Sequence, residues 1–294
     1  MSYNTGGPVK VSIFTGDAIQ ELEALSDNSV QCCVTSPPYW GLRDYGHPGQ
    51  LGVESSPEDY TEALVKVFRA VKRVLKDDGV LWVNLGDSYS RGDRKSVPPQ
   101  KGSAASKVED QKYCFDSASA QIGDHPIIKP KDLIGIPWRV AFALQEDGWF
   151  LRQDIIWHKP NPMPESVADR CTKSHEYIFM LTKSPRYFFD AEAIKERSNE
   201  PLQEDLKRNK RSVWTIQTTR YEEAHFATFP TDIPSYCILA SSAPGDTVLD
   251  PFAGSGTTGM VALKHGRNAV MIELNPEYAE LAGRRCDITP GFSF

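Results

Sequence analysis

Apolar residues recur along this chain at two spacings, and each spacing predicts one kind of element. Short apolar runs bounded by Gly, Asp, Ser or Pro are typical of buried strands, whereas apolar residues three or four positions apart are typical of helices packed on one face. The two kinds alternate along the chain, which is typical of an α/β protein. The expected strands are 9–15, 30–35, 80–85, 150–157, 177–182, 247–250 and 269–273, and the expected helices are 18–25, 59–75, 136–145, 233–241, 257–265 and 276–285.

Two polar segments interrupt this pattern. Residues 88–130 are rich in Lys, Ser, Gly and Pro, and such a length without regular structure is usually functional or disordered. Residues 191–222 are highly charged, and we expect 191–212 to be helical in part. Both segments carry cations that could contact phosphate groups or simply be solvated. They are Arg91, Arg94, Lys95, Lys101, Lys107 and Lys112 in the first segment and Lys207, Arg208, Lys210 and Arg211 in the second.

The bulk composition limits the functions to consider. The chain has 294 residues, of which 40% are hydrophobic and 24% charged, so we expect residues 1–294 to form one large globular domain with insertions. The formal net charge of −6 argues against a purely electrostatic nucleic-acid binder but leaves room for a local basic face. Six Cys without a C-x-x-C pair predict reduced thiols and no metal site. No apolar run reaches the ~18 residues of a membrane span and no signal segment is recognisable, so a cytoplasmic location is expected.

Two short segments carry the candidate chemistry. Ser36-Pro37-Pro38-Tyr39 follows the expected strand 30–35, at the strand end where α/β proteins place functional residues. Residues 250–259, which read DPFAGSGTTG, lie between an expected strand and an expected helix. Glycines there let a ligand approach the backbone, and the N–H groups at a helix start favour a polar or anionic group. A phosphate loop would need a Lys-Ser or Lys-Thr pair that is absent, and the G-x-G-x-x-G spacing of a dinucleotide site is weak by itself.

Together and in this order, the two segments resemble the circularly permuted, β-arranged group of DNA amino-methyltransferases, in which the catalytic tetrapeptide precedes the cofactor loop. The resemblance implies a Rossmann-like fold with a mostly parallel sheet, one antiparallel strand and helices on both faces. It also implies S-adenosylmethionine (AdoMet) as cofactor and double-stranded DNA as substrate. Further strings fit the same family: Ile13–Asp17 before the tetrapeptide, Ile156–Asn161 and Ser174–Tyr177 as walls of the base pocket, and Arg211–Trp214 and His225–Pro230 before the cofactor strand.

The same resemblance assigns the cofactor residues. Glu273, at the end of the strand after the loop, is expected to bind the ribose hydroxyls. Asp17 is expected near the adenine and Asp250 near the methionine end, while Phe226 or Phe229 would line the pocket. The complete expected set is Asp17, Phe229, Asp250, Phe252, Gly254, Ser255, Gly256, Thr257, Thr258, Glu273 and Asn275.

The tetrapeptide suits the activation of an exocyclic amine on a nucleobase. Such an amine is conjugated with its ring and is a poor nucleophile, so a site promotes its attack with two acceptors, one for each N–H. Ser36 Oγ and the Pro37 carbonyl are the candidates, and Pro37 and Pro38 limit where that carbonyl points. Tyr39 is expected to stack on a base extruded from the duplex. The Pro-Cys dipeptide of cytosine-C5 enzymes is absent, in agreement with a mechanism that needs no covalent enzyme intermediate.

Ser36 favours cytosine N4 as the methyl acceptor, because adenine-N6 members of the family usually carry Asp or Asn at this position. Adenine N6 stays an alternative, as do a protein glutamine, RNA and a catalytically silent DNA-binding module. His158 could act as a base or as a structural hydrogen-bonding group, and the segments 88–130 and 191–222 are candidate target-recognition elements. The sequence leaves open the recognised DNA sequence, a cognate restriction endonuclease, and the choice between monomer and homodimer. The residues expected to contact DNA or the base are Trp40, His158, Lys159, Lys207, Arg208, Lys210 and Arg211.

Overall fold

The computed structural model describes residues 9–42, 46–90, 125–197, 207–218 and 229–287, together with the backbone of residues 119–120. Its main sheet has eight strands in the order β1-β12-β11-β2-β3-β7-β6-β10. These strands are β1 (Val11–Thr15), β2 (Val30–Thr35), β3 (Leu75–Leu85), β6 (Phe150–His158), β7 (His175–Thr182), β10 (Val213–Thr215), β11 (Thr247–Asp250) and β12 (Asn268–Glu273). Two short strand pairs lie outside this sheet: β4 (Tyr89–Ser90) with β5 (Ser119–Ala120), and β8 (Glu196–Arg197) with β9 (Lys207–Arg208).

One strand of the main sheet runs against all the others. β7 pairs antiparallel with both of its neighbours, β3 and β6, whereas the remaining pairs in the sheet are parallel. The expected α/β fold, with a mostly parallel sheet and one antiparallel strand, is therefore confirmed.

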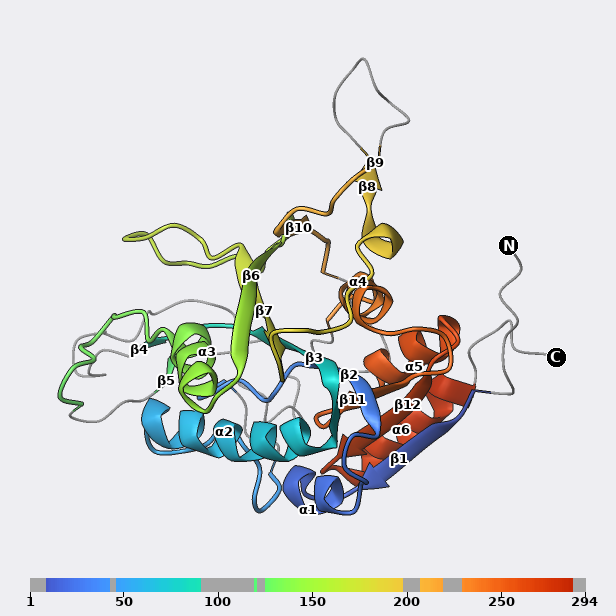
Figure 1. Ribbon diagram of the computed structural model, residues 1–294. Helices are drawn as coiled ribbons and strands as arrows, with labels where there is room; N and C mark the ends of the chain where they lie inside the picture. The colour runs from blue at the N-terminus through green and yellow to red at the C-terminus, as the bar shows by residue number, and fades with distance from the viewer. Residues whose placement is uncertain are drawn as a thin grey trace.

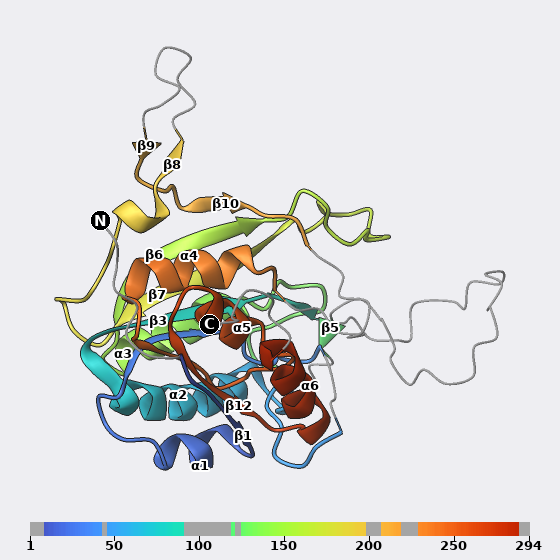
Figure 2. The same cartoon turned by 90° about the vertical axis from the view of Figure 1, so that its right-hand side faces the viewer.

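Helices cover both faces of the sheet (Figures 1 and 2). On one face, α1, α2 and α3 pack over a hydrophobic cluster that includes Leu81, Leu85 and Phe179. On the other face, α4 and α5 pack over Val34, Trp82 and their neighbours, and α6 packs over a further cluster that includes Met271. The helices are α1 (Ala18–Glu23), α2 (Pro57–Val74), α3 (Ile136–Glu146), α4 (Asp232–Ser241), α5 (Thr257–Lys264) and α6 (Pro276–Asp287).

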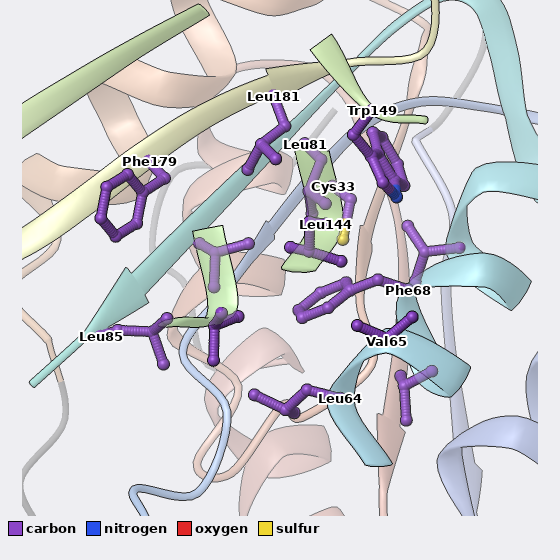
Figure 3. Close-up of a cluster of buried hydrophobic side chains, with 14 of the residues drawn as sticks. Cys33, Leu64, Val65, Phe68, Leu81, Leu85, Leu144, Trp149, Phe179 and Leu181 are labelled. Carbon is purple, nitrogen blue, oxygen red and sulfur yellow. The ribbon is translucent and has the colours of Figure 1, made fainter. Parts of the chain in front are cut away.

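The alternation of side chains along β2 explains why this strand is buried throughout. All six of its residues are buried, because consecutive side chains of a strand point to opposite faces and both faces are covered. Cys33 joins the cluster beneath α2 and α3, where Figure 3 shows it near Leu81 and Leu144, whereas Cys32 joins the cluster beneath α4 and α5.

The longest helix, α2, shows how the sequence specifies an element. Ser56 caps its start by accepting a hydrogen bond from the Asp59 N–H, and Pro57 occupies the first helical position, where no N–H is needed. The helix then buries a stripe at helical spacing against the sheet (Figure 3). That stripe includes Tyr60, Leu64, Val67, Phe68, Val71 and Val74.

The expected helices and strands agree with the structure to within about two residues at each end, with one exception. β3 begins at Leu75, because Leu75 already pairs with Val30 and the register then shifts before Val80 pairs with Cys32. The polar residues between them therefore form an irregularity at the start of the strand.

The charged segment differs from expectation. Within the described part of 191–212, residues 191–197 and 207–212, one 3-10 turn at Glu192–Ile194 is the only helical structure, in place of the expected partial helix. Beyond it, β8 and β9 form an antiparallel pair, which projects from the body of the molecule in both views (Figures 1 and 2). Arg208 Nε lies 3.0 Å from Glu196 Oε1, so opposite charges pair across these strands.

A short edge strand was also missed. β10 has three residues, which is too few for alternation to be recognised, and it pairs in parallel with β6. The expectations for the cations between Arg91 and Lys112, and for His225 and Phe226, fall outside the described residues.

Candidate functional site

The loops that follow four parallel strands surround one cavity of about 380 Å³. These loops follow β1, β2, β11 and β12, and residues 47–51 and α2 close another side. Parallel strands bring their carboxyl ends to the same edge of a sheet, which is where open α/β sheets bind ligands. Of the expected site residues, the cavity is lined by Asp17, Ser36, Pro37, Pro38, Tyr39, Lys159, Phe229, Phe252, Gly254, Ser255, Thr257, Glu273 and Asn275.

The glycine loop between β11 and α5 has a backbone that only glycine readily adopts. Gly254 and Gly256 have φ angles of +52° and +79°. A Cβ on Gly256 would lie 2.7 Å from the Ala282 Cβ on α6, so this glycine lets the loop pack against that helix and does not line the cavity. A Cβ on Gly254 would meet no other atom within 4 Å, so the backbone there is open to a ligand.

Glu273 connects the loop to the end of β12. Its Oε2 accepts a hydrogen bond of 2.7 Å from the Gly254 N–H, and its Oε1 accepts one of 2.9 Å from the Asn275 N–H. Burial raises the pKa of this carboxyl above its ordinary value. A buried carboxylate on the cavity wall suits a ligand with hydroxyl groups, since hydroxyls can donate to it.

Asp17 also has a defined local role on the cavity wall. Its Oδ1 accepts hydrogen bonds from the Ile19 and Gln20 N–H groups and so caps α1. Because the cap positions the first turn of α1 beside the cavity, Asp17 shapes this wall as well as lining it.

Asp250 does not line the cavity but holds its frame together. The residue is 1% exposed, and it accepts hydrogen bonds of 2.7 Å from both Thr35 Oγ1 and Thr258 Oγ1, and one of 3.1 Å from the Phe252 N–H. Burial raises the pKa of Asp250 to about 6, against the opposing effect of these donors. Thr258 is likewise buried, and Asp250 and Thr258 together position the loop rather than contact a ligand.

The tetrapeptide is fixed by contacts from three directions. The Tyr60 hydroxyl on α2 donates a 2.8 Å hydrogen bond to the Pro38 carbonyl. The Tyr39 ring packs directly on Gly86, where a Cβ would lie 2.5 Å from the Tyr39 Cε2. Ser36 Oγ donates to the Tyr39 hydroxyl over 3.4 Å.

Sequence reasoning did not assign a role to Glu176, which the structure places against the tetrapeptide. The Tyr39 hydroxyl donates a 2.7 Å hydrogen bond to Glu176 Oε2, and Asn84 Nδ2 donates to the same oxygen over 3.1 Å. Lys159 Nζ forms an ion pair with Glu176 Oε1 and lies 4.3 Å from the centre of the Trp157 ring. Burial, and next the Glu176 charge, raise the pKa of Tyr39 well above its ordinary value. Glu176 belongs to the string Ser174–Tyr177, which was expected to wall the base pocket. That string alone does not indicate that Glu176 contacts Tyr39, which lies 137 residues away in the sequence.

Some residues expected to contact DNA lie elsewhere. Trp40 is 3% exposed and its Nε1 donates to the Glu54 carbonyl, so it packs in the core and does not line the cavity. His158 Nδ1 lies 3.2 Å from Thr215 Oγ1, also away from the cavity wall.

The cations of the charged segment divide into two kinds. Lys210 Nζ lies 3.7 Å from the centre of the Tyr236 ring, and burial lowers the pKa of this lysine. Arg208 is paired with Glu196. Arg211 Nε also lies near Glu196 Oε1, at 3.9 Å, but the Arg211 side chain is exposed, as is that of Lys207, so these two are the more accessible of the four cations.

Asp250→Asn should change how stability depends on pH. The pKa of Asp250 is about 6 in the folded protein against an ordinary 3.8, so the unfolded chain loses its proton first. As pH rises from about 4 to about 6, this carboxyl therefore lowers the free energy of unfolding. Asn cannot titrate, so between about pH 4 and about pH 7 the free energy of unfolding of the variant should rise by about 3 kcal/mol relative to that of the wild type.

Urea unfolding of both proteins across this pH range measures the difference. Glu62→Gln, which removes an exposed carboxylate on α2, serves as the control and should keep the wild-type slope. Parallel stability curves for the wild type and Asp250→Asn would show that Asp250 does not titrate in this range.

The sheet order and the cavity at the strand ends define a Rossmann-like methyltransferase fold. The family model for N6/N4 DNA methylases matches residues 30–284 of this chain. The chain belongs to this DNA methylase family.

Relatives with curated names cover almost the whole chain. The Type II methyltransferase M.Cfr9I of Citrobacter freundii is 54% identical over 93% of this chain and 87% of its own length. The Type II methyltransferase M.SmaI of Serratia marcescens is 51% identical over 93% of this chain and 89% of its own length.

Solved structures show the same fold. The PvuII DNA methyltransferase, described as cytosine-N4-specific, superimposes with a TM-score of 0.67 at 21% identity, over 96% of this chain and 90% of its own. The putative DNA modification methylase TTHA0409 of Thermus thermophilus, in complex with S-adenosyl-L-methionine, gives a TM-score of 0.62 at 27% identity, over 97% and 98% of the two chains.

The described residues lack two kinds of feature. None of the helices there has the length and apolar character needed to span a lipid bilayer. Within the same residues, no three His, Cys, Asp or Glu side chains are grouped as metal ligands.

Proposed function

We propose that this protein transfers a methyl group from AdoMet to the N4 amine of cytosine in double-stranded DNA. The observation that carries the proposal is the placement of Ser36 and the Gly254 loop on the walls of one cavity. The Type II relatives and the fold shared with a cytosine-N4-specific enzyme support it. Adenine N6 is the second candidate, because the family includes enzymes that act on either base.

The residues of the cavity fit AdoMet. In this proposal Glu273 accepts hydrogen bonds from the ribose hydroxyls, and the open backbone at Gly254 lets the cofactor approach closely. Asp17 also lines the cavity and in this proposal lies near the adenine of AdoMet. Phe229 and Phe252 supply apolar contact with the cofactor. When bound, AdoMet supplies an electrophilic methyl group on its sulfonium sulfur.

The tetrapeptide then orients the target amine. Ser36 Oγ and the Pro37 carbonyl accept the two N–H bonds, which favours the geometry in which the nitrogen lone pair faces the methyl group. The Tyr60 hydroxyl holds the adjacent Pro38 carbonyl and so restrains the backbone around Pro37. The target base reaches this site only after leaving the duplex, and Tyr39 on the cavity wall would contact its ring.

In this proposal residues 1–294 act as one catalytic domain. The segments 88–130 and 191–222 serve target recognition, with Lys207 and Arg211 contacting phosphate groups and positioning the enzyme without reading sequence.

Mass spectrometry of nucleosides from DNA treated with the protein and AdoMet tests the base directly. N4-methylcytosine is the expected product. N6-methyladenine would keep the cofactor site and the tetrapeptide chemistry but overturn the assignment of the base, and absence of both products would overturn the proposed activity.

Ser36→Ala should slow methyl transfer about 100-fold, because one preorganised acceptor for the developing charge is lost. AdoMet affinity should change less than about twofold, since Ser36 is assigned to the base. Single-turnover rates and calorimetric AdoMet titrations separate the two effects. A variant with the wild-type rate would remove Ser36 from the mechanism.

Glu273→Ala should weaken AdoMet binding by about tenfold to a hundredfold, the range expected for lost hydrogen bonds to a charged acceptor. Glu273→Gln is the matched variant, because it keeps the volume and one accepting oxygen, and it should lie between the wild type and Ala. Calorimetry measures the affinities, and equal affinity in all three proteins would rule out a ribose contact.

A further inference from the structure

We propose that Glu176 receives the proton that leaves the target amine, through Ser36 and Tyr39. The inference rests on the proposed function and adds to it a residue that does not touch the base. Glu176 is the first charged side chain reached from Ser36 through hydrogen bonds, on the far side of Tyr39.

The hydrogen bonds point in one direction along this path. Ser36 Oγ donates to the Tyr39 hydroxyl, and the Tyr39 hydroxyl donates to Glu176 Oε2 over 2.7 Å. Asn84 Oδ1 is a second acceptor for the same hydroxyl, at the longer distance of 3.3 Å. Each hydroxyl can therefore accept a proton on one side while giving its own on the other. The first step is long at 3.4 Å and the second is 2.7 Å; such contacts are often loose without substrate and tighten in the reacting complex.

Polar side chains surround the Glu176 carboxylate and hold it in place. Its side chain is 13% exposed, and it is paired with Lys159, whose side chain is 18% exposed. Asn84 Nδ2 donates to Oε2 and also to the Tyr177 carbonyl, which fixes the amide between β3 and β7. Among the described residues, Lys173 and His175 also interact electrostatically with Glu176, and burial lowers the pKa of each. Lys159 is the cation in direct contact with the Glu176 carboxylate.

The partly buried ion pair of Lys159 and Glu176 beside the tetrapeptide is not explained by stability alone. Such pairs often stabilise a fold no better than apolar side chains of the same size, because both charges lose their hydration. Here the pair ends on the cavity wall, with Lys159, Glu176 and Asn84 all lining it. A proton path explains why the carboxylate lies at this position.

The proposed step moves one methyl group and one proton. The amine nitrogen forms the N–CH3 bond with its lone pair while the S–CH3 bond breaks and that electron pair stays on sulfur. One amine proton passes to Ser36 Oγ, the Ser36 proton passes to the Tyr39 oxygen, and the Tyr39 proton passes to Glu176 Oε2. Ser36 and Tyr39 end as neutral hydroxyls, Glu176 ends as a neutral carboxylic acid, and the methylated amine is neutral.

Glu176→Gln tests the path, because it keeps the size and an accepting oxygen for Tyr39 but cannot take the proton. Single-turnover methyl transfer should fall about 100-fold, as expected for loss of a general base, with AdoMet affinity changed less than about twofold. Tyr39→Phe should give a similar loss, and the double variant should be no slower than the slower single variant, since both interrupt one path. Additive losses, or a wild-type rate in Glu176→Gln, would overturn the proposal.

Two further measurements separate proton transfer from positioning. The wild-type single-turnover rate should be slower in deuterium oxide, and Glu176→Gln should lose that isotope effect. No isotope effect in the wild type would overturn the proposal. Combining Lys159→Met with Glu176→Gln removes the unpaired lysine charge; recovery of the wild-type rate would show that this charge, not the lost acceptor, caused the defect.

Asp246→Asn is the control for losing an ion pair. Asp246 pairs with Lys76 at the opposite ends of the strands, 2.9 Å apart, and its loss should leave methyl transfer unchanged. The activity of the wild type separates failure of the proposed function from failure of the proton path. If it methylates no base, the proposed function fails; if it methylates DNA and Glu176→Gln is equally fast, only the proton path fails.

Discussion

One buried carboxylate sets the spacing between the two halves of the cavity. Asp250 ends β11 and accepts hydrogen bonds from Thr35, the last residue of β2, and from Thr258 in the first turn of α5. A buried carboxylate without donors would be costly, so these groups are held where they can satisfy it. The residue after Thr35 is Ser36, and the residues after Asp250 form the glycine loop. Asp250 therefore couples the proposed methyl acceptor site to the cofactor site across 215 residues of sequence.

The parts of this architecture that depend on local patterns could be predicted from the sequence. β2 and β11 are short, largely apolar runs that stop just before Pro37 and Pro251, and their ends follow from those prolines. The general rule that parallel strands place their carboxyl ends together predicts a shared edge for both strands, whereas their pairing as neighbours, with Cys32 opposite Val248, comes from the structure. That rule was sufficient to bring the tetrapeptide and the glycine loop to one edge of the sheet.

Side-chain exposure was not predictable in the same way, and it decides which residues can meet a ligand. Trp40 follows the tetrapeptide directly, yet it turns into the core because its indole nitrogen finds the Glu54 carbonyl. Lys210 lies within a run of four cations, yet its ammonium group packs on Tyr236. Composition counts both as polar or aromatic groups near a site, whereas the partner that removes each from solvent comes from a distant part of the chain.

The direction of β7 explains why the role of Glu176 could not be predicted from the positions of strand ends, as it could for the rest of the site. In α/β proteins, functional side chains are expected at the carboxyl ends of strands, but β7 runs the other way and brings its first residues to that edge. His175 and Glu176 pair with His158 and Trp157 at the end of β6, and Tyr177 pairs with Leu85 at the end of β3. The reversal puts a carboxylate beside Asn84 and Lys159, which lie at or just beyond the carboxyl ends of their strands. The cofactor half of the cavity is thus built from parallel strands alone, whereas the base half depends on the single strand that breaks the pattern.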